Sequence, residues 1–330
     1  MRPFSYERAD DTQNLSRLQT GPTTQFLAGG TTLVDLMKLG TMTPAALVDI
    51  NGLDSRYGAI SLTDGTLHLG ALAHMSTAAA HPDIRRDFPV IAQSLDLAAS
   101  PQIRNMATLG GNVLQRTRCN YFRDPSWTAC NKRNPGSGCG AISGVNRKHA
   151  VLGVSEHCIA TYPGDFAQAL VALDAKVEIS GPAGDRVIRF EDLHLAPGDT
   201  PHRETVLRQG DLITGFTIPT GPWTRRSLYL KIRDRESYEF ALASAAVALQ
   251  IEDNVVREAR IALGGVATKP WRSREAEESL IGKSVTPATA EAAGWAAFAI
   301  NTTHGENTYK PTLGRRTLER ALLHAAQLEV

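Results

Sequence analysis

The amino-acid sequence predicts an α+β fold with two or three domains. The chain has 330 residues, of which 42% are hydrophobic, enough to bury a large core. Short strand and helix patterns alternate through the first half. In the last third, two long strand patterns are followed by three helix patterns, an order typical of α+β domains.

The first predicted unit is a strand, a glycine turn and a helix. The strand covers residues 25–28, and the helix that follows repeats apolar residues on one face. A threonine is suited to cap the start of this helix, and a glycine is suited to end it. The residues concerned are Gly29 and Gly30 in the turn, Leu33, Leu36 and Met37 on the face, Thr31 or Thr32 at the cap, and Gly40 at the end.

The remaining elements follow the same local patterns. Before the cysteine-containing region we expect strands at 46–50 and 67–72 and a helix at about 89–99; after it we expect a helix at 165–173 and a strand at 176–180. Turn-forming glycines and prolines at 215–223 suggest a domain boundary there. Beyond it we expect strands at 239–251 and 255–266 and helices at 273–282, 287–300 and 313–328.

Composition excludes several classes of function. A net charge of +1 argues against nucleic acid as the main partner, because phosphate binding requires a basic excess. No stretch approaches the roughly 20 apolar residues of a membrane span. Residues 1–11 lack the apolar core of a secretory signal, so we expect a soluble chain that could be exported only with help from another protein.

All four cysteines fall in one short stretch of the chain. They are Cys119, Cys130, Cys139 and Cys158. Thiolates gathered among basic residues suit a soft metal centre with net negative charge, such as an iron–sulfur cluster. The basic residues are Arg116, Arg118, Arg123, Lys132, Arg133, Arg147 and Lys148.

Other readings of the cysteines stay open on spacing alone. The pattern C-x10-C-x8-C-x18-C has no tight pair of the kind that structural zinc sites use. Disulfides are most useful to small domains, and this chain is long. Four unrelated buried cysteines would be expected to scatter along the sequence. The turn-rich segment 131–139 contains Pro135, Gly136 and Gly138, which would let the backbone wrap around a buried anion.

Two Gly-Gly turns suggest phosphate binding. In the segment 27–33, LAGGTTL, a glycine turn leads into a helix, where backbone N–H groups suit a pyrophosphate. The segment 108–112, TLGGN, repeats the pattern. Neither matches the dinucleotide fingerprint or the P-loop, and a lone Gly-Gly turn is more often plain topology. Two such loops on one ligand would form a dinucleotide site without a Rossmann fold.

Four segments together resemble a known family. They are AGGTTL at 28–33, QIRNMATLGGNV at 102–113, GDFAQALVALDAKV at 164–177 and RIALGGVATKPWR at 260–272. In this order they resemble the FAD-binding medium subunit of the xanthine dehydrogenase, or molybdenum hydroxylase, family. The cysteine-containing insert is similar to that of the FAD and 4Fe-4S subunit of bacterial periplasmic-type aldehyde oxidoreductases. The likeness spans nearly the whole chain.

The resemblance implies a domain plan and two cofactors. It implies a FAD-binding domain of the vanillyl-alcohol-oxidase type, with two subdomains, over residues 1–222. It places a 4Fe-4S insert at about 116–160, with the four cysteines as ligands. It implies a C-terminal α/β domain of the CO dehydrogenase flavoprotein type over 223–330.

The same resemblance implies the FAD-binding residues. The pyrophosphate would lie on Leu27, Ala28, Gly29, Gly30, Thr31, Thr32 and Leu33, and Thr108, Gly111 and Asn112 would complete the phosphate and ribitol contacts. Asp165 would bind the adenosine side or its ribose, Ile213 would lie by a ring system, and Lys231 would reach the flavin. Many relatives have Asn where Thr32 stands, which puts that one hydrogen bond in doubt.

Some of these residues have simpler readings. Asp165 would serve as a helix N-cap, and Lys231 would be an ordinary exposed strand residue. Tyr238, with Phe240 nearby, falls where the family places residues beside the isoalloxazine. We expect Tyr238 to cover one flavin face and to restrict access by a nicotinamide; the alternative is a ring packed in the C-terminal domain.

The implied function is electron transfer within an enzyme complex. A large molybdenum-cofactor subunit would oxidise an aldehyde, a small 2Fe-2S subunit would pass electrons to FAD, and an external acceptor would take them. No residue of this chain is expected to be catalytic, because the redox chemistry belongs to the cofactors. The complex would assemble in the cytoplasm and could reach the periplasm on a partner's signal. The alternatives are a free-standing flavin oxidase and a non-enzymatic metal-stapled binding module.

Overall fold

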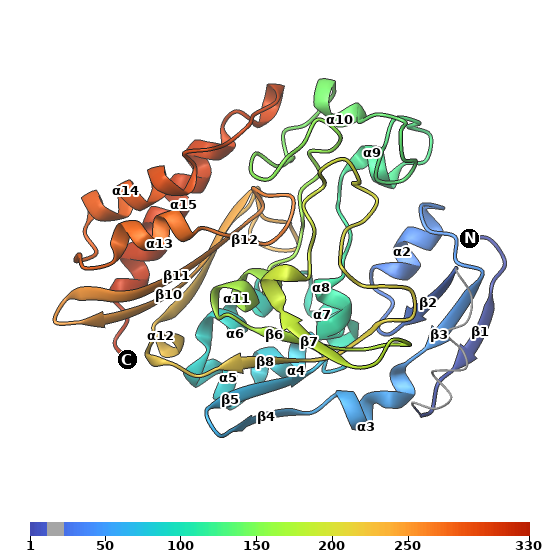
Figure 1. Cartoon of the computed structure of the whole chain (residues 1–330), viewed down its shortest axis with the longest axis horizontal. Helices are drawn as coiled ribbons and strands as arrows, with labels where there is room; N and C mark the ends of the chain where they lie inside the picture. Colours follow the sequence, from blue (N-terminus) through green and yellow to red (C-terminus); the bar gives the residue numbers. More distant parts are fainter. Residues whose placement is uncertain (12–22) are drawn as a thin grey trace.

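The computed structural model describes residues 1–11 and 23–330. Its strands form three sheets, of three, five and four strands, which follow one another along the chain (Figure 1). Within the described ranges, every helix is too short or too polar to cross a bilayer.

The N-terminal sheet is parallel and has the order β1-β3-β2. Its strands are β1 (Ser5–Arg8), β2 (Thr24–Leu27) and β3 (Ala46–Asp49), with α2 (Leu33–Lys38) leading from β2 toward β3. The predicted glycine turn lies directly after β2, as expected. Thr32 occupies the N-cap of α2 without a side-chain cap bond. Gly40 has φ +72°, so the predicted end of the helix is confirmed.

The second sheet has the order β4-β5-β8-β6-β7 and is antiparallel throughout. Its strands are β4 (Ile60–Thr63), β5 (Thr66–Gly70), β6 (Lys176–Ser180), β7 (Arg186–Arg189) and β8 (Leu212–Pro219). Gly215 pairs with both β5 and β6, so the predicted boundary at 215–223 begins too early. The turn-formers at 215–219 lie in a central strand because the strand's partners, distant in sequence, supply its hydrogen bonds.

Helices pack on this sheet and enclose the largest hydrophobic core, which includes Phe88, Phe166 and Phe216. They are α4 (Met75–Ala80), α5 (Pro82–Asp87), α6 (Pro89–Asp96), α7 (Pro101–Met106), α8 (Leu109–Val113) and α11 (Phe166–Ala172), with α3 (Asp54–Tyr57) before β4. The helices expected at 89–99 and 165–173 correspond to α6 and α11.

Residues 116–160, which we call the cysteine segment, contain little regular structure. Their only helices are α9 (Asn120–Arg123) and α10 (Gly140–Ser143). Phe122 and Tyr121 each centre a small apolar cluster, and Val151 and Leu152 pack into the core of the C-terminal region. In Figure 1 the segment stands at the edge of the molecule, beside the C-terminal helices and α2. It therefore depends on contacts other than a core of its own.

The C-terminal region is an antiparallel sheet with the order β12-β11-β10-β9, covered by helices. Its elements are α12 (Pro222–Arg225), β9 (Ser227–Ile232), β10 (Ala243–Glu252), β11 (Val255–Gly264), β12 (Trp271–Arg272), α13 (Arg274–Leu280), α14 (Pro287–Ala297) and α15 (Lys310–Ala326). Residues 239–242, expected to begin a strand, lie in a loop before β10 instead. The three predicted helices are confirmed.

Candidate cofactor sites

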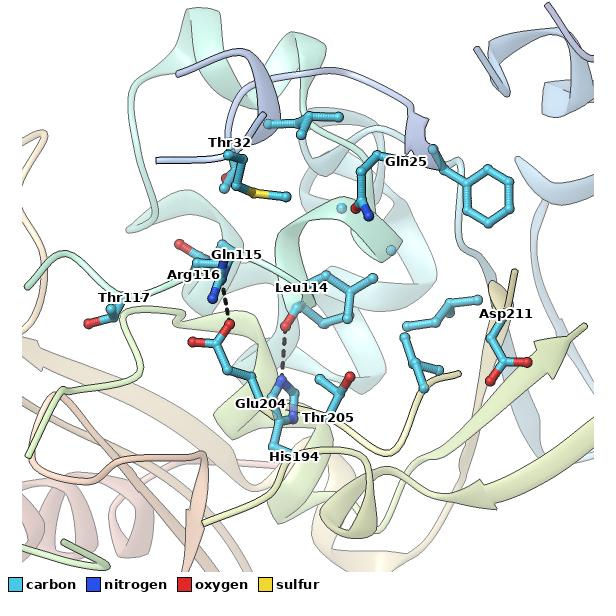
Figure 2. A pocket seen from close by; sticks show the side chains of 18 of the residues that line it. Gln25, Thr32, Leu114, Gln115, Arg116, Thr117, His194, Glu204, Thr205 and Asp211 are labelled. Carbon is cyan, nitrogen blue, oxygen red and sulfur yellow. Dashed lines mark hydrogen bonds and ion pairs between the residues drawn. The ribbon is translucent and has the colours of Figure 1, made fainter. Parts of the chain in front are cut away.

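A cavity of about 590 Å³, which we call the large cavity, lies between the N-terminal sheet and the loop that leads into β8. Figure 2 shows side chains from both sides of it. Of the residues predicted to bind FAD, nine line this cavity: Ala28, Gly29, Gly30, Thr31, Thr32, Leu33, Thr108, Gly111 and Ile213. The volume is in the range of cofactor sites.

The first glycine turn is shaped by close backbone contact. A Cβ on Gly29 would lie 1.9 Å from the carbonyl oxygen of Met106, so only glycine fits there. Gly30 has φ +69°, which glycine adopts without strain. In the described part of the chain, the backbone N–H groups of residues 29–33 donate no hydrogen bond to another protein group. Such N–H groups suit an anionic phosphate.

The second glycine turn lies close to the first, since Met106 and Ala107, which Gly29 contacts, lead into it. Thr108 caps α8, and its Oγ1 accepts a hydrogen bond from the Gly111 N–H at 3.2 Å. The Gly110 N–H donates to Ala71, and a Cβ on Gly110 would meet the Ala71 Cβ at 3.0 Å. The structure thus brings together two loops that lie about eighty positions apart in the sequence, and both line the large cavity.

Asn112 and Leu27 do not line this cavity. The Nδ2 of Asn112 lies 3.3 Å from the Met75 sulfur, and its buried Oδ1 has no partner. Leu27 ends β2 and is absent from the lining, although its neighbours Phe26 and Ala28 belong to it. Contact of either residue with FAD stays a prediction.

Asp165 and Lys231 pair with each other, away from the cavity lining. The Lys231 Nζ lies 2.7 Å from Asp165 Oδ2 and donates to the Leu97 carbonyl at 3.0 Å, while the Tyr229 hydroxyl donates to Asp165 Oδ1 at 2.6 Å. Burial, followed by the charge of Asp165, raises the pKa of Tyr229 well above its usual value. The two charges are therefore satisfied by groups of the protein itself.

This arrangement corrects both simpler readings. The Lys231 side chain is 1% exposed, so it is not a surface strand residue. Asp165 stands at the N-cap of α11, but its carboxylate makes no cap bond. Direct contact of either residue with FAD stays a prediction, and it would require the Asp165–Lys231 pair to rearrange.

Tyr238 lies in the loop before β10 and is 55% exposed with φ +53°. Its ring therefore does not pack inside the C-terminal domain, as the alternative reading required, and the residue does not line the large cavity. The Arg235 guanidinium lies 5.8 Å from the centre of its ring. Phe240 packs under the Arg118 guanidinium at 4.7 Å. Shielding of a flavin face by Tyr238 stays a prediction.

The four cysteines converge on one small cavity, the cysteine cavity, which all four line. Cys130 and Cys139 face each other in an isolated β-bridge. The Cys119 sulfur lies 3.2 Å from His149 Nε2, and the Cys158 sulfur accepts from the Ala160 N–H at 3.4 Å. All four are free thiols, so the structure does not support disulfides.

Burial dominates the electrostatics of this cavity. It raises the pKa of Cys119 to about 12 and that of Cys158 to about 11. Burial, with a smaller effect from the charge of Lys310, lowers the pKa of His149 to about 4. The thiols of Cys119 and Cys158 are therefore protonated at neutral pH until a metal replaces the protons.

The predicted 4Fe-4S site is not preformed. Within residues 1–11 and 23–330, no three His, Cys, Asp or Glu side chains are arranged to hold a metal ion. The cysteine cavity measures about 10 Å³, room for about one water molecule. Four convergent sulfur atoms fit an iron–sulfur cluster in kind, but the space between them would have to open. Binding of a 4Fe-4S cluster by the four cysteines therefore stays a prediction.

Several lining residues were missed by sequence reasoning. Glu204, His194 and Gln25 carry no motif and come from irregular stretches or a short strand (Figure 2). The His194 ring nitrogen lies 2.9 Å from the Val113 carbonyl, and burial lowers the pKa of this histidine to about 4. Arg116 was noted only as a basic neighbour of the cysteines.

Comparison with known proteins agrees with this geometry. The family model of the FAD binding domain in molybdopterin dehydrogenase matches residues 2–221. The model of the CO dehydrogenase flavoprotein C-terminal domain matches residues 228–325. The chain is 46% identical to the aldehyde oxidoreductase FAD-binding subunit PaoB of Escherichia coli (strain K12) over 98% of this chain and 99% of that protein.

More distant relatives match over most of their length. The carbon monoxide dehydrogenase medium chain of Hydrogenophaga pseudoflava is 25% identical over 92% of this chain and 90% of that protein. A solved structure of carbon monoxide dehydrogenase from the same organism, lacking the Mo-pyranopterin moiety, has a TM-score of 0.76 at 24% identity. It covers 98% of this chain and 97% of its own, and it shows the fold alone. The chain therefore belongs to the FAD-binding subunits of the molybdopterin dehydrogenase family and is an oxidoreductase subunit.

Proposed function

We propose that this chain is the electron-transfer flavoprotein subunit of a heteromeric molybdenum aldehyde oxidoreductase. It would take electrons from the 2Fe-2S clusters of a small subunit, after a large molybdenum subunit has oxidised the aldehyde, and pass them to an external acceptor. The single observation that carries the proposal is the 46% identity, over nearly the full length of both chains, to a subunit named for aldehyde oxidation and FAD binding.

The large cavity is the proposed FAD site. The turn at Gly29 and Gly30 would hold the phosphates by its backbone N–H groups, Thr108 and Gly111 would complete the phosphate and ribitol contacts, and Ile213 would lie against a ring system. Bound FAD supplies the ability to accept electrons singly and release them singly or in pairs. The chain's own residues bind and orient the cofactor, and none is required as an acid or base.

We also propose that the four cysteines hold a 4Fe-4S cluster. Their convergence on one cavity, which Lys132 also lines, supports this. The raised pKa values of Cys119 and Cys158 mean that binding of the cluster must release protons, as thiolate ligands require.

The proposed domain plan is a FAD domain at 1–222 with the cluster insert at about 116–160, and a flavoprotein domain at 223–330. We further propose that the enzyme complex assembles in the cytoplasm and can reach the periplasm on the export signal of a partner subunit.

Cofactor analysis of the purified chain tests both cofactors at once. We expect flavin absorbance, one FAD per chain, and iron with acid-labile sulfide in equal amounts. Colourless protein would refute the FAD site, and zinc in place of iron would refute the cluster.

Turnover tests the proposed place in a complex. We expect an aldehyde to reduce the flavin only when the large and small partner subunits are present. Reduction of FAD by an organic substrate in the isolated chain would instead identify a free-standing flavin oxidase. A chain with metal but no flavin would be a metal-stapled binding module.

A further inference from the structure

The loop between β7 and β8 forms one wall of the large cavity. It folds back on itself, with the Val206 N–H donating to Leu193 at 3.0 Å and the Leu195 N–H donating to Glu204 at 3.0 Å. Residues on its second arm, including His202 and Glu204, line the cavity. In Figure 1 the loop rises from the sheet toward the cysteine segment. We call residues 193–206 the cover loop.

Glu204 joins the cover loop to the cysteine segment through two cations. Its Oε2 lies 2.5 Å from the Arg116 Nε, and its Oε1 lies 2.8 Å from the Lys132 Nζ. Figure 2 shows the Arg116 contact at the cavity wall. Lys132 makes a second bond to the loop, donating to the Pro201 carbonyl at 3.0 Å. Both oxygens of one carboxylate are thus used, and Lys132 contacts the loop twice.

The three side chains are mostly shielded from solvent. Their exposed fractions are 22% for Arg116, 25% for Glu204 and 12% for Lys132. The Arg116 guanidinium also stacks over the Phe122 ring at 4.5 Å, which fixes its direction. Burial alone would raise the pKa of Glu204, but Arg116 and Lys132 outweigh it and hold the pKa below its usual value. The bridge is therefore charged at neutral pH.

Lys132 lies in a wall that the two cavities share. Lys132, Cys158 and Ala160 line both the large cavity and the cysteine cavity. Its neighbour Asn131 is held on both sides, donating to the His157 carbonyl at 3.0 Å and accepting from the Gly138 N–H at 2.8 Å. The position of Lys132 is thus set by the fold of the cysteine segment, and Lys132 in turn sets the position of the cover loop.

We propose that Glu204 is a positioning residue that fastens the cover loop to Lys132 and Arg116 and so closes the large cavity over its cofactor. The inference rests on the proposed FAD site. When the bridge is intact, the loop is held down and FAD leaves slowly. When the bridge is lost, the loop lifts and FAD leaves faster, because lost contacts act mainly on dissociation.

The experiment compares Glu204→Gln and Lys132→Gln with the wild-type chain in the full-length protein. We expect the FAD dissociation rate, followed by the rise in flavin fluorescence on dilution, to increase by about tenfold in each variant. The double variant should release FAD less fast than the product of the two single effects predicts, since the single changes share the Glu204–Lys132 contact. Backbone hydrogen exchange in residues 193–206 should accelerate in all three.

Asp174→Asn is the matched control. Asp174 is also a carboxylate that contacts two arginines, Arg260 and Arg272, but it lies outside both cavities. It has φ +51°, a conformation that asparagine tolerates. We expect wild-type FAD release and wild-type exchange of the cover loop in this variant.

Two results would overturn the inference: FAD release and loop exchange unchanged in both bridge variants, or fully additive effects in the double variant. Exchange is also measured without added FAD. A chain that bound no FAD would refute the proposed function, while the fastening of the loop would still be decided by its exchange rates.

Discussion

The two candidate cofactor sites are built in opposite ways. The large cavity is formed by backbone turns that are anchored to two sheets, with a volume of about 590 Å³ before any cofactor is considered. The cysteine cavity measures about 10 Å³ and lies in a segment with two four-residue helices. One site is preorganised, and the other would have to be opened by its ligand.

The difference follows from how each region is stabilised. The glycine turns of the large cavity adjoin the molecule's largest core. In the cysteine segment, only Val151 and Leu152 pack in a large core. Side chains bond to the rest of its backbone, such as Lys310 to the Lys148 carbonyl and Arg133 to the Tyr121 and Phe122 carbonyls. A segment without a core of its own can gain much of its folding free energy from a bound metal centre. The comparison predicts different results for substitutions at the two sites. In the large cavity, a larger side chain should block FAD binding sterically. In the cysteine cavity, loss of a ligand should reduce the stability of the cysteine segment.

The largest effect is expected from Gly29→Ala. The new Cβ would lie 1.9 Å from the Met106 carbonyl oxygen, so the two glycine turns must separate. Overpacking of this size should weaken FAD binding about 100-fold. Equilibrium titration of flavin fluorescence measures it. Gly294→Ala in α14 is the control, because its nearest contact is the flexible end of Glu319 at 3.1 Å. Unchanged affinity in Gly29→Ala would mean that FAD binds elsewhere.

Cys139→Ser should lower the iron content of the protein while leaving most of its FAD bound. We expect iron and sulfide to fall to about a tenth of the wild-type content, since a hydroxyl is a poor replacement for a thiolate ligand. FAD content should stay above about half, because Cys139 does not line the large cavity. Ser126→Ala, in an exposed turn of the same segment, is the control. Equal loss of FAD and iron would show that the sites do not form independently.

Lys310 gives a pH test of how the cysteine segment is held. Burial lowers the pKa of this lysine from 10.5 to about 7, while its Nζ donates to Lys148 and Gly265. Between these pH values the unfolded chain binds the extra proton, so the stability of the folded protein should rise from about pH 7 to 10, by on the order of 2 to 4 kcal/mol.

Lys310→Met should lose that rise, although its overall stability falls because two carbonyls lose their donor. Urea unfolding across the pH range measures both. Lys283→Met, which alters an exposed lysine in a turn, should keep the wild-type slope. A wild-type slope in Lys310→Met would assign the pH dependence to another group.

The smallest effect is expected from Asp234→Asn, at the contact between the cysteine segment and the loop that carries Tyr238. Arg147 bonds both oxygens of Asp234 at 2.9 Å, but the two side chains are 47% and 35% exposed. An exposed pair of this kind should contribute less than about 1 kcal/mol, and less still in concentrated salt. Thermal unfolding at low and high salt checks this. A larger, salt-independent loss would show that the loop is a rigid part of the segment's support.

The local elements were predictable because their signals are local. The turn after β2, the helices α6, α11 and α13 to α15, and the hairpin β10–β11 all follow apolar spacing and turn residues. Strands β8 and β9 were not predicted. β8 contains Gly215 and Pro219, which are typical of turns, and its partner β5 is distant in sequence. The resemblance to a family supplied the rest of the expected site.

By itself, the sequence determined the two glycine turns, the gathering of four thiols in one segment and the order of the C-terminal elements, because each depends on residues that are close together in the chain. Only the tertiary structure decided that Asp165 pairs with Lys231, that Glu204 bridges to Arg116 and Lys132, and that the thiols enclose a nearly closed space. Such pairings depend on which buried charged groups come within bonding distance when segments far apart in the sequence pack together. A local sequence pattern does not predict that distance.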